Sequence, residues 1–212
     1  MGSPLAGRFV VLGVTGGIAA YKAVEICRRM VDAGAHVAPV LTEGAEQFIG
    51  AATFSALASE PVQRTLWGEP SPIPHTRLGQ NADLVVVAPA TARLLGSYAA
   101  GISDDLLTAT LLATRAPVMV CPAMHTEMWE HPAVQDNLSV LASRGVSIVP
   151  PEEGRLAGGD VGAGRLADPA VIVSAVEGVL APQDMAGLDV LITAGGTREA
   201  IDPVRVVTNR SS

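Results

Sequence analysis

A loop that mixes polar, sulfur-containing and aromatic side chains follows a short apolar run in the middle of the chain. The loop spans residues 122–129 and carries His125, Met128 and Trp129, and the apolar run before it spans residues 118–121. An apolar run that ends at a proline predicts a buried strand whose carboxyl end opens into a loop, which is where open α/β sheets bind ligands. Methionine and tryptophan side chains beside an imidazole could hold a flat ring together with a small polar group. On composition alone, a hydrophobic plug over the sheet is an equally good interpretation.

A glycine-rich turn lies near the N-terminus, between an apolar run and a helical pattern. Gly16 and Gly17 precede Ile18, the apolar run covers residues 9–13, and apolar residues recur at helical spacing over 23–31. Glycine lets a backbone approach a phosphate closely, and the free N–H groups and dipole at a helix start attract the anion. The spacing matches neither the dinucleotide fingerprint nor the Walker loop. A phosphate-binding turn and a simple tight turn therefore both remain open.

Small residues follow two further apolar runs. Thr42 comes directly after residues 36–41, and Thr91 and Ala92 come shortly after residues 84–88. Because the carboxyl ends of parallel strands meet at one edge of a sheet, these residues should lie beside the glycine-rich turn. Thr42 has a second interpretation, since a threonine there could cap the helix that follows.

The chain alternates continuous apolar runs with amphipathic stretches. That alternation predicts βαβ units with right-handed crossovers, and hence an α/β fold built on a doubly wound parallel sheet. The ligand-binding loops should gather at one edge of this sheet. The predicted strands cover residues 9–13, 36–41, 84–88, 118–121 and 146–149, and the predicted helices after the first one cover 104–114, 132–143 and 169–179.

Composition and charge argue against several kinds of function. A formal net charge of -7 over 212 residues disfavours general binding to nucleic acid or to an anionic membrane, so any phosphate on a ligand must be held locally. We expect neither a signal peptide nor a membrane span. The two cysteines form no disulfide framework and no zinc spacing, which favours a reducing cytoplasm and predicts no metal site.

The loop at residues 122–129 resembles the Pro-x-Met-Asn-x-x-Met-Trp signature of the FMN-dependent cysteine decarboxylases, a family of flavoproteins. The turn Gly-Gly-Ile-Ala at residues 16–19 and the segment Ala-Pro-Ala-Thr-Ala at residues 88–92 resemble motifs of the same family. The resemblance implies a Rossmann-like, flavodoxin-like fold. It also implies FMN as cofactor, contacted by Gly16, Gly17, Ile18, Thr42, Thr91, Ala92 and Ala123.

The resemblance assigns further roles around the substrate. His75 falls on the family's catalytic histidine, although a lone histidine in a loop is more often an ordinary surface residue. His125 stands where the family usually has asparagine, and it would contact the substrate carboxylate next to Met128. Residues 153–165 resemble the mobile clamp that covers the substrate, in which Gly158 replaces a proton-donating cysteine. Because Gly158 cannot donate a proton, either water or another acid completes the reduction, or an enethiol is released.

For the activity, the resemblance implies FMN-dependent decarboxylation of 4'-phosphopantothenoylcysteine to 4'-phosphopantetheine in coenzyme A biosynthesis. Oxidation of the thiol-bearing carbon to a thioaldehyde would create the electron sink that loss of CO2 needs. Relatives built from trimers imply a homotrimer or a dodecamer of trimers, with His75 within reach of a neighbouring subunit's flavin. The alternatives are a peptidyl-cysteine decarboxylase that releases an enethiol and a non-catalytic regulatory flavoprotein subunit.

The sequence changes character near its C-terminal end, which predicts a decarboxylase domain at 1–182 and a second segment at 183–212. A new buried strand is predicted at 189–193. The second segment resembles the opening of the CTP-dependent phosphopantothenoylcysteine synthetase, a phosphopantothenate-cysteine ligase. The resemblance places Arg205 and Asn209 against the acyl-cytidylate substrate of that enzyme, which also requires Mg. We therefore expect a truncated bifunctional protein.

Overall fold

The computed structural model describes residues 2–67, 72–182, 187–192 and 198–208. The chain divides into two compact units, residues 1–181 and residues 182–212, and each is described by itself. Among the residues described, no helix has both the length and the apolar composition needed to cross a lipid bilayer.

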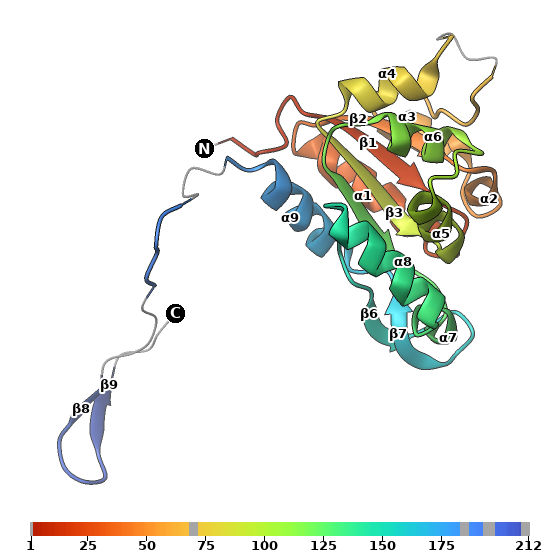
Figure 1. Cartoon of the computed structure of the whole chain (residues 1–212). Coiled ribbons are helices and arrows are strands. Elements are labelled where there is room, and N and C mark those ends of the chain that lie inside the picture. The colour runs from red at the N-terminus through yellow and green to blue at the C-terminus, as the bar shows by residue number, and fades with distance from the viewer. Residues whose placement is uncertain (1, 68–71, 183–186, 193–197, 209–212) are drawn as a thin grey trace. The chain divides into compact units, whose positions relative to one another are not determined.

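A five-stranded parallel sheet runs through the larger unit in the order β2-β1-β3-β4-β5 (Figure 1). This is the order of flavodoxin-like doubly wound sheets, in which the winding reverses between β1 and β3 and ligands bind at the carboxyl ends of these strands. The predicted fold class is therefore confirmed. The strands are β1 (Phe9–Val14), β2 (His36–Leu41), β3 (Leu84–Ala90), β4 (Val118–Pro122) and β5 (Ser147–Ile148).

Helices cover both faces of the sheet, because successive side chains of each strand enter two different cores. Leu12 of β1 belongs to the core that includes Ile26 of α1 and Ile172 of α9, whereas Val11 belongs to the core under α4, α5, α6 and α8. The helices are α1 (Ala20–Asp32), α2 (Glu43–Glu46), α3 (Ala51–Leu57), α4 (Pro74–Asn81), α5 (Ala92–Ala100), α6 (Leu106–Ala113), α7 (Thr126–Trp129), α8 (Pro132–Ser143) and α9 (Pro169–Leu180).

The predicted helices at 104–114, 132–143 and 169–179 correspond to α6, α8 and α9 and are confirmed. Each begins at a side chain that accepts a hydrogen bond from the first turn. Asp105 accepts from the backbone N–H of Thr108 at 2.7 Å, and Asp168 accepts from that of Ala170 at 2.8 Å. Such caps satisfy backbone donors that the helix itself leaves unpaired.

A β-hairpin separates β5 from α9. Its strands β6 (Glu152–Arg155) and β7 (Val161–Arg165) pair antiparallel and form a two-stranded sheet of their own. The sequence predicts only a glycine-rich clamp here, because glycines interrupt the alternation that identifies a strand. One of them fixes the hairpin to the loop after β4. Gly164 has a φ of 132°, and a Cβ on it would lie 2.1 Å from the carbonyl oxygen of Met124.

The smaller unit contains a hairpin in which β8 (Arg198–Ala200) pairs antiparallel with β9 (Val206–Thr208). The strand predicted at 189–193 is wrong over its described part, since residues 189–192 form no strand and Leu191 is 89% exposed. The last residue of that prediction lies outside the described residues. A buried parallel strand needs neighbours that cover its apolar side chains, and the described part of this unit supplies none.

Candidate active site

A cavity of about 790 Å³ opens at the carboxyl edge of the sheet, between the start of α1 and the β6–β7 hairpin. A smaller cavity of about 260 Å³ adjoins it, shares several lining residues with it and also contains Thr42. The larger volume is typical of a small-molecule site. The predicted residues that line the larger cavity are Gly16, Gly17, Ile18, Thr91, Ala92, Ala123, His125 and Met128.

The two glycines of the first turn have different structural roles. A Cβ on Gly16 would lie 2.7 Å from the carbonyl carbon of Gly44, so only glycine lets this turn touch the loop after β2. A Cβ on Gly17 would have its nearest neighbour at 3.9 Å, the methyl group of Thr91. In the described part of the chain, the N–H groups of Gly16, Gly17 and Ile18 donate to no protein acceptor. Three free donors before α1, beside a cavity, fit a phosphate.

Threonine hydroxyls join the first turn to the end of β3. Thr15 Oγ1 donates to the carbonyl oxygen of Pro89 at 2.7 Å and accepts from the N–H of Thr91 at 3.1 Å. Sequence reasoning missed Thr15, although a hydroxyl directly after a buried strand was a usable signal. Thr42 and Thr91 cap α2 and α5, which confirms the capping interpretation of Thr42. Both also line the smaller cavity, so the same hydroxyls remain candidates for contact with a ligand.

His125 connects the loop after β4 to the tip of the hairpin. Its Nδ1 contacts the carboxylate of Glu127, and its Nε2 lies 3.1 Å from Oδ2 of Asp160. The hydrogen bond with Glu127 and, next, the one with Asp160 raise the pKa of His125, because both carboxylates stabilise the charged ring. The side chain is 40% exposed, so a ligand can reach it. The arrangement favours an imidazolium that donates to an anion.

Position 158 lies beside this imidazole. A Cβ there would be 3.7 Å from Nε2 of His125 and 3.3 Å from Oδ2 of Asp160. Thr126 holds the hairpin in place by donating its hydroxyl to the carbonyl oxygen of Ala163 at 2.8 Å. The structure thus brings Gly158 and His125 together at one end of the cavity, and their roles toward a substrate remain predictions.

His75 lies apart from the cavity of its own chain. It is the second residue of α4, which Figure 1 places at the opposite end of the larger unit from α7 and the β6–β7 hairpin. It lines neither of the two adjoining cavities. Its Nδ1 is buried and has no hydrogen-bond partner in the described part of the chain. A buried nitrogen without a partner indicates a group that a ligand or a neighbouring molecule satisfies.

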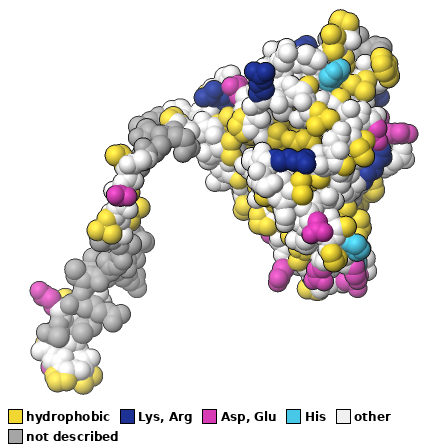
Figure 2. Space-filling model, viewed as in Figure 1, with side chains coloured by type: hydrophobic (Ala, Val, Ile, Leu, Met, Phe, Trp, Pro, Cys, Tyr) yellow, Lys and Arg dark blue, Asp and Glu magenta, His cyan; other side chains and the backbone are white. Residues whose placement is uncertain are grey.

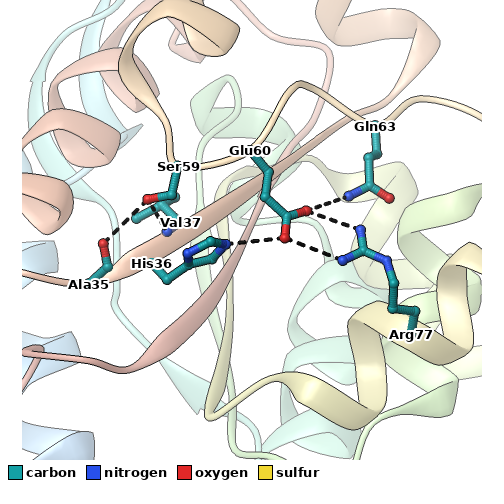
Figure 3. A network of polar contacts seen from close by, with 7 residues as sticks. All are labelled: Ala35, His36, Val37, Ser59, Glu60, Gln63 and Arg77. Atoms are coloured by element: carbon teal, nitrogen blue, oxygen red, sulfur yellow. Dashed lines mark hydrogen bonds and ion pairs between the residues drawn. The ribbon is translucent and has the colours of Figure 1, made fainter. Parts of the chain in front are cut away.

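A network of charges anchors α4 to the rest of the unit (Figure 3). The Arg77 guanidinium donates to both oxygens of Glu60, at 3.0 and 3.3 Å, and Nε2 of His36 lies 3.1 Å from the same carboxylate. Burial opposes the ionisation of Glu60, but the hydrogen bonds with Arg77 and His36 outweigh it and lower the pKa. Because Arg77 is two residues from His75, this network sets the position of the first turn of α4.

Three further side chains have structural roles: Arg93 forms an ion pair, and the two cysteines are buried. Arg93 pairs with Asp104 at 3.0 Å at the border of the smaller cavity. Burial raises the pKa of Cys121 to about 12 and that of Cys27 to about 11, so both are core residues rather than acids of the site. Among the described residues, no three His, Cys, Asp or Glu side chains are grouped so that they could hold a metal ion.

The two predicted residues of the second segment lie in the smaller unit. Arg205 stands directly before β9, and its guanidinium pairs with the carboxylate of Asp202. Two backbone N–H groups of the same turn, those of Val204 and Arg205, also donate to Asp202 and help to lower its pKa. Asn209 lies outside the described residues. The role of both residues toward an acyl-cytidylate remains a prediction.

Residues 3–181 match the family described as Flavoprotein, and residues 185–212 match the DNA/pantothenate metabolism flavoprotein C-terminal domain. The chain is 53% identical over 208 residues to the coenzyme A biosynthesis bifunctional protein CoaBC of Mycobacterium bovis. The aligned residues cover 96% of this chain and 50% of that protein. It is 49% identical over 210 residues to the protein of the same name from Bacillus subtilis. That alignment covers 97% of this chain and 52% of the relative. The chain therefore spans about half the length of these curated relatives.

Two solved structures share the fold. A PPC decarboxylase complexed with pantothenoylaminoethenethiol matches with a TM-score of 0.72 and 32% identity, over 80% of this chain and 96% of that chain. The FMN-dependent cysteine decarboxylase SpaF matches with a TM-score of 0.72 and 33% identity, over 83% of this chain and 97% of that chain. These matches agree with the α/β fold of the larger unit. The chain belongs to the flavoprotein family.

Proposed function

We propose that the larger unit uses FMN to decarboxylate the cysteine moiety of 4'-phosphopantothenoylcysteine, and that it yields 4'-phosphopantetheine for coenzyme A biosynthesis in the cytoplasm. One observation carries the proposal. On one side of the cavity, here called the sheet side, residues 16–18 offer N–H groups that have no acceptor in the described part of the chain. On the other side, the hairpin side, lies His125, whose raised pKa favours the charged imidazole. The names of the relatives, a coenzyme A biosynthesis protein and a PPC decarboxylase, support the same reaction.

Residues on the sheet side of the cavity suit FMN. The free N–H groups of residues 16–18 suit its phosphate, because they precede a helix and have no protein acceptor in the described part of the chain. FMN, when bound, supplies a reversible two-electron acceptor for the thiol-bearing carbon of the substrate. The chain itself orients that carbon and limits the access of water from the hairpin side. The other residues proposed to border FMN are Thr42, Thr91, Ala92 and Ala123.

His125 binds the carboxylate that leaves as CO2. Glu127 holds Nδ1 and keeps the ring charged, so that Nε2 is the donor directed toward the hairpin tip. A charge-assisted hydrogen bond holds the carboxylate in one direction, and with it the bond that breaks. Met128 lines the same part of the cavity and packs against the substrate beside this donor.

The same imidazole supplies the proton that completes the product. Gly158 has no acidic proton. Cys121 is buried, and burial raises the pKa of its thiol to about 12, so it does not supply the proton. Nε2 of His125 lies 3.7 Å from the place where a Cβ at position 158 would stand. Its raised pKa means that it carries a proton over a wider pH range than an ordinary histidine.

His75 takes the thiol proton in the cavity of a neighbouring subunit. Its separation from the cavity of its own chain and its unpartnered buried Nδ1 support this assignment. Ile18 and Tyr21 are 61% and 60% exposed at the cavity, and large apolar side chains at such a place favour cover by a second copy. The proposed assembly is a homotrimer or a dodecamer of trimers.

The mass of the reaction product tests the proposal. The flavin-loaded chain is incubated without oxygen with 4'-phosphopantothenoylcysteine, and the expected product is 4'-phosphopantetheine. A product that lacks two hydrogens relative to it would keep the decarboxylation but contradict the proton donation by His125. No release of CO2 would contradict the proposed function.

A peptide with a C-terminal cysteine is the second candidate substrate. The similarity to the cysteine decarboxylase SpaF and the absence of a thiol at Gly158 favour it. Turnover of such a peptide without turnover of 4'-phosphopantothenoylcysteine would replace the first proposal. Turnover of neither would support a non-catalytic flavoprotein subunit.

For the smaller unit, we propose a part in the ligase that joins phosphopantothenate to cysteine with CTP and Mg. The match of residues 185–212 to the pantothenate metabolism domain supports this assignment. Arg205 and Asn209 would contact the acyl-cytidylate. In a protein that contains the complete domain, Arg205→Ala should abolish CTP-dependent ligation and leave decarboxylation intact.

A further inference from the structure

Three basic side chains line the 790 Å³ cavity. Lys22 of α1 and Arg155 and Arg165 of the hairpin line it, and no described Asp or Glu does. The chain has 14 Lys and Arg against 21 Asp and Glu, and Figure 2 shows acidic side chains gathered at the end of the larger unit that carries α7. A cavity lined by cations within an acidic chain is a local site for an anion.

The three cations come from α1 and from the two strands of the hairpin. Nζ of Lys22 donates to the carbonyl oxygen of Leu166 at 3.1 Å, directly after β7. The side chain of Arg165 extends along β6, so that a Cβ on Gly154 would lie 3.3 Å from its Nη1. Arg165 therefore lies on the face of β6 to which Gly154 points, and Arg155, the next residue of that strand, also lines the cavity.

These charges are only partly neutralised by the protein. Arg165 lies 3.7 Å from the carboxylate of Glu152, whereas Lys22 and Arg155 form no ion pair with any described residue. Burial and, next, the charge of Arg165 lower the pKa of Lys22, against the opposing effect of nearby acids such as Glu152. Neighbouring cations disfavour each other's charged forms, and a dianion between them removes that cost.

We propose that Lys22, Arg155 and Arg165 bind the phosphate monoester dianion of the substrate. This inference rests on the proposed function and adds the part of the site that selects a phosphorylated substrate over a peptide. The phosphate of FMN has the same chemistry, but the free N–H groups of residues 16–18 are available for it. Arg155 and Arg165 instead belong to the hairpin, whose tip contacts His125. The hairpin would therefore hold the substrate at both of its charged ends.

Kinetics with and without the phosphate group test the inference. For the unsubstituted flavin-loaded chain, the KM for 4'-phosphopantothenoylcysteine should be lower than that for pantothenoylcysteine by roughly tenfold or more, the effect of a charge-assisted contact. Arg155→Ala and Lys22→Gln should each raise the KM for the phosphorylated substrate and bring the ratio of the two KM values toward one. Arg155→Lys, which keeps the charge without the planar fork, should retain part of the ratio.

Arg115→Ala is the matched control for the loss of one positive charge. Arg115 is exposed, forms no ion pair with a described residue and lines none of the three cavities found at this edge. The control should keep both the KM ratio and the flavin content. A second measurement titrates 4'-phosphopantetheine and pantetheine into each protein by calorimetry, which follows binding without turnover.

Three results would overturn the inference. The first is an unsubstituted protein that gives equal KM values for the two substrates. The second is loss of bound flavin, seen as loss of visible absorbance, in Arg155→Ala or Lys22→Gln, which would assign these cations to FMN. The third is a control that lowers the ratio as much as Arg155→Ala does. No turnover of either substrate by the unsubstituted protein would contradict the proposed function, and calorimetry would then decide the phosphate site by itself.

Discussion

The two sides of the main cavity are held together in different ways. On the sheet side, the backbone of Gly16 packs against Gly44, and the buried hydroxyl of Thr15 joins the ends of β1 and β3. On the hairpin side, the base of the hairpin also packs closely, at Gly164 against Met124, but His125 itself is held by exposed side chains such as Asp160. Close backbone packing leaves no room for an added atom, whereas an exposed side-chain pair can be exchanged at little cost in stability.

The difference explains where this chain departs from the family motifs. His125 and Gly158, the two departures to which the resemblance gives a chemical role, both belong to the hairpin side. Arg93, at the border of the smaller cavity, is likewise an exposed side chain and pairs with Asp104. The part of the site proposed for FMN is fixed by backbone contacts, so variation in substrate chemistry enters through side chains on the opposite side.

We expect the largest loss of stability and of bound flavin from a substitution on the sheet side of the cavity. In Gly16→Val, the new Cβ would lie 2.7 Å from the carbonyl carbon of Gly44, so the first turn has to move away from the loop after β2. We expect a loss of about 1–3 kcal/mol in the free energy of unfolding, as for other overpacked sites, and nearly complete loss of bound flavin. Thermal unfolding and visible absorbance measure the two effects.

Gly17→Ala is the matched control for that substitution. Its Cβ would have no neighbour within 3.9 Å, so the free energy of unfolding should stay within about 0.5 kcal/mol of the original. If Gly16→Val unfolds at the same temperature as the original chain, the two sides of the cavity do not differ as described.

A substitution on the hairpin side should lower the rate of decarboxylation without loss of bound flavin. We expect His125→Ala to keep its flavin and to lower the rate of decarboxylation by about 100-fold, the usual effect of removing one donor from a reacting group. Release of CO2 and flavin content per chain measure the two properties. His125→Asn, which keeps a donor of shorter reach, should fall between the two, and normal turnover by His125→Ala would refute the carboxylate contact.

The charge on His125 should make this side sensitive to pH. Its pKa is raised, so the contribution of the charged ring to the rate should be lost as pH rises through that pKa. Any stability from the same cation is likewise present below the ordinary pKa of histidine and lost as pH rises through the raised one. Glu127→Gln removes the larger cause of the shift, so the fall in kcat/KM should move to lower pH.

Glu130→Gln is the control for the pH experiment. Glu130 is also exposed and ends the same short helix, but it makes no contact with His125. Its profile of kcat/KM against pH should overlay that of the original chain. Identical profiles for Glu127→Gln and Glu130→Gln would mean that Glu127 does not set the charge of the imidazole.

The smallest effect should come from the network that anchors α4. Glu60→Gln weakens the ion pair with Arg77, which should cost about 1 kcal/mol in the free energy of unfolding and lower turnover a few-fold with flavin retained. If Glu60 acts by positioning His75, adding Glu60→Gln to His75→Asn should lower turnover no further. Additive losses would make Glu60 a purely structural residue. Glu46→Gln, which breaks the exposed pair with Arg64, is the control.

Most of the sheet could be predicted from sequence, because strands buried on both faces are continuous apolar runs. The predictions at 9–13, 36–41, 84–88 and 118–121 match β1 to β4. The strand predicted at 146–149 is only two residues long in the structure, as β5. It lies at the edge of the sheet and pairs with β4 alone. An edge strand has fewer partners to extend its hydrogen bonding, so an apolar run overstates its length.

The contacts of the site were less accessible to sequence reasoning. His125 and Asp160 are separated by 35 residues, and the glycine-rich hairpin between them has no periodicity that fixes where its tip lies. The order of motifs aligned His75 with the family's catalytic histidine, and the trimeric relatives implied that it could serve a neighbouring subunit's flavin. Neither signal could show that its Nδ1 is buried without a partner in the described part of the chain. Residues 189–192 show the opposite error, because an apolar run predicts a strand only where other strands can cover it.

Asp160 occupies the imidazole nitrogen that we assign to the substrate carboxylate. If His125 binds the substrate carboxylate as proposed, that carboxylate has to displace Asp160 from Nε2. In that case the substrate would bind to the fraction of molecules in which Asp160 has released His125, and the apparent dissociation constant would be the intrinsic one divided by that fraction. A substrate whose phosphate is already bound by the hairpin would compete with Asp160 at a high local concentration, so it should bind better than a carboxylate without a phosphate.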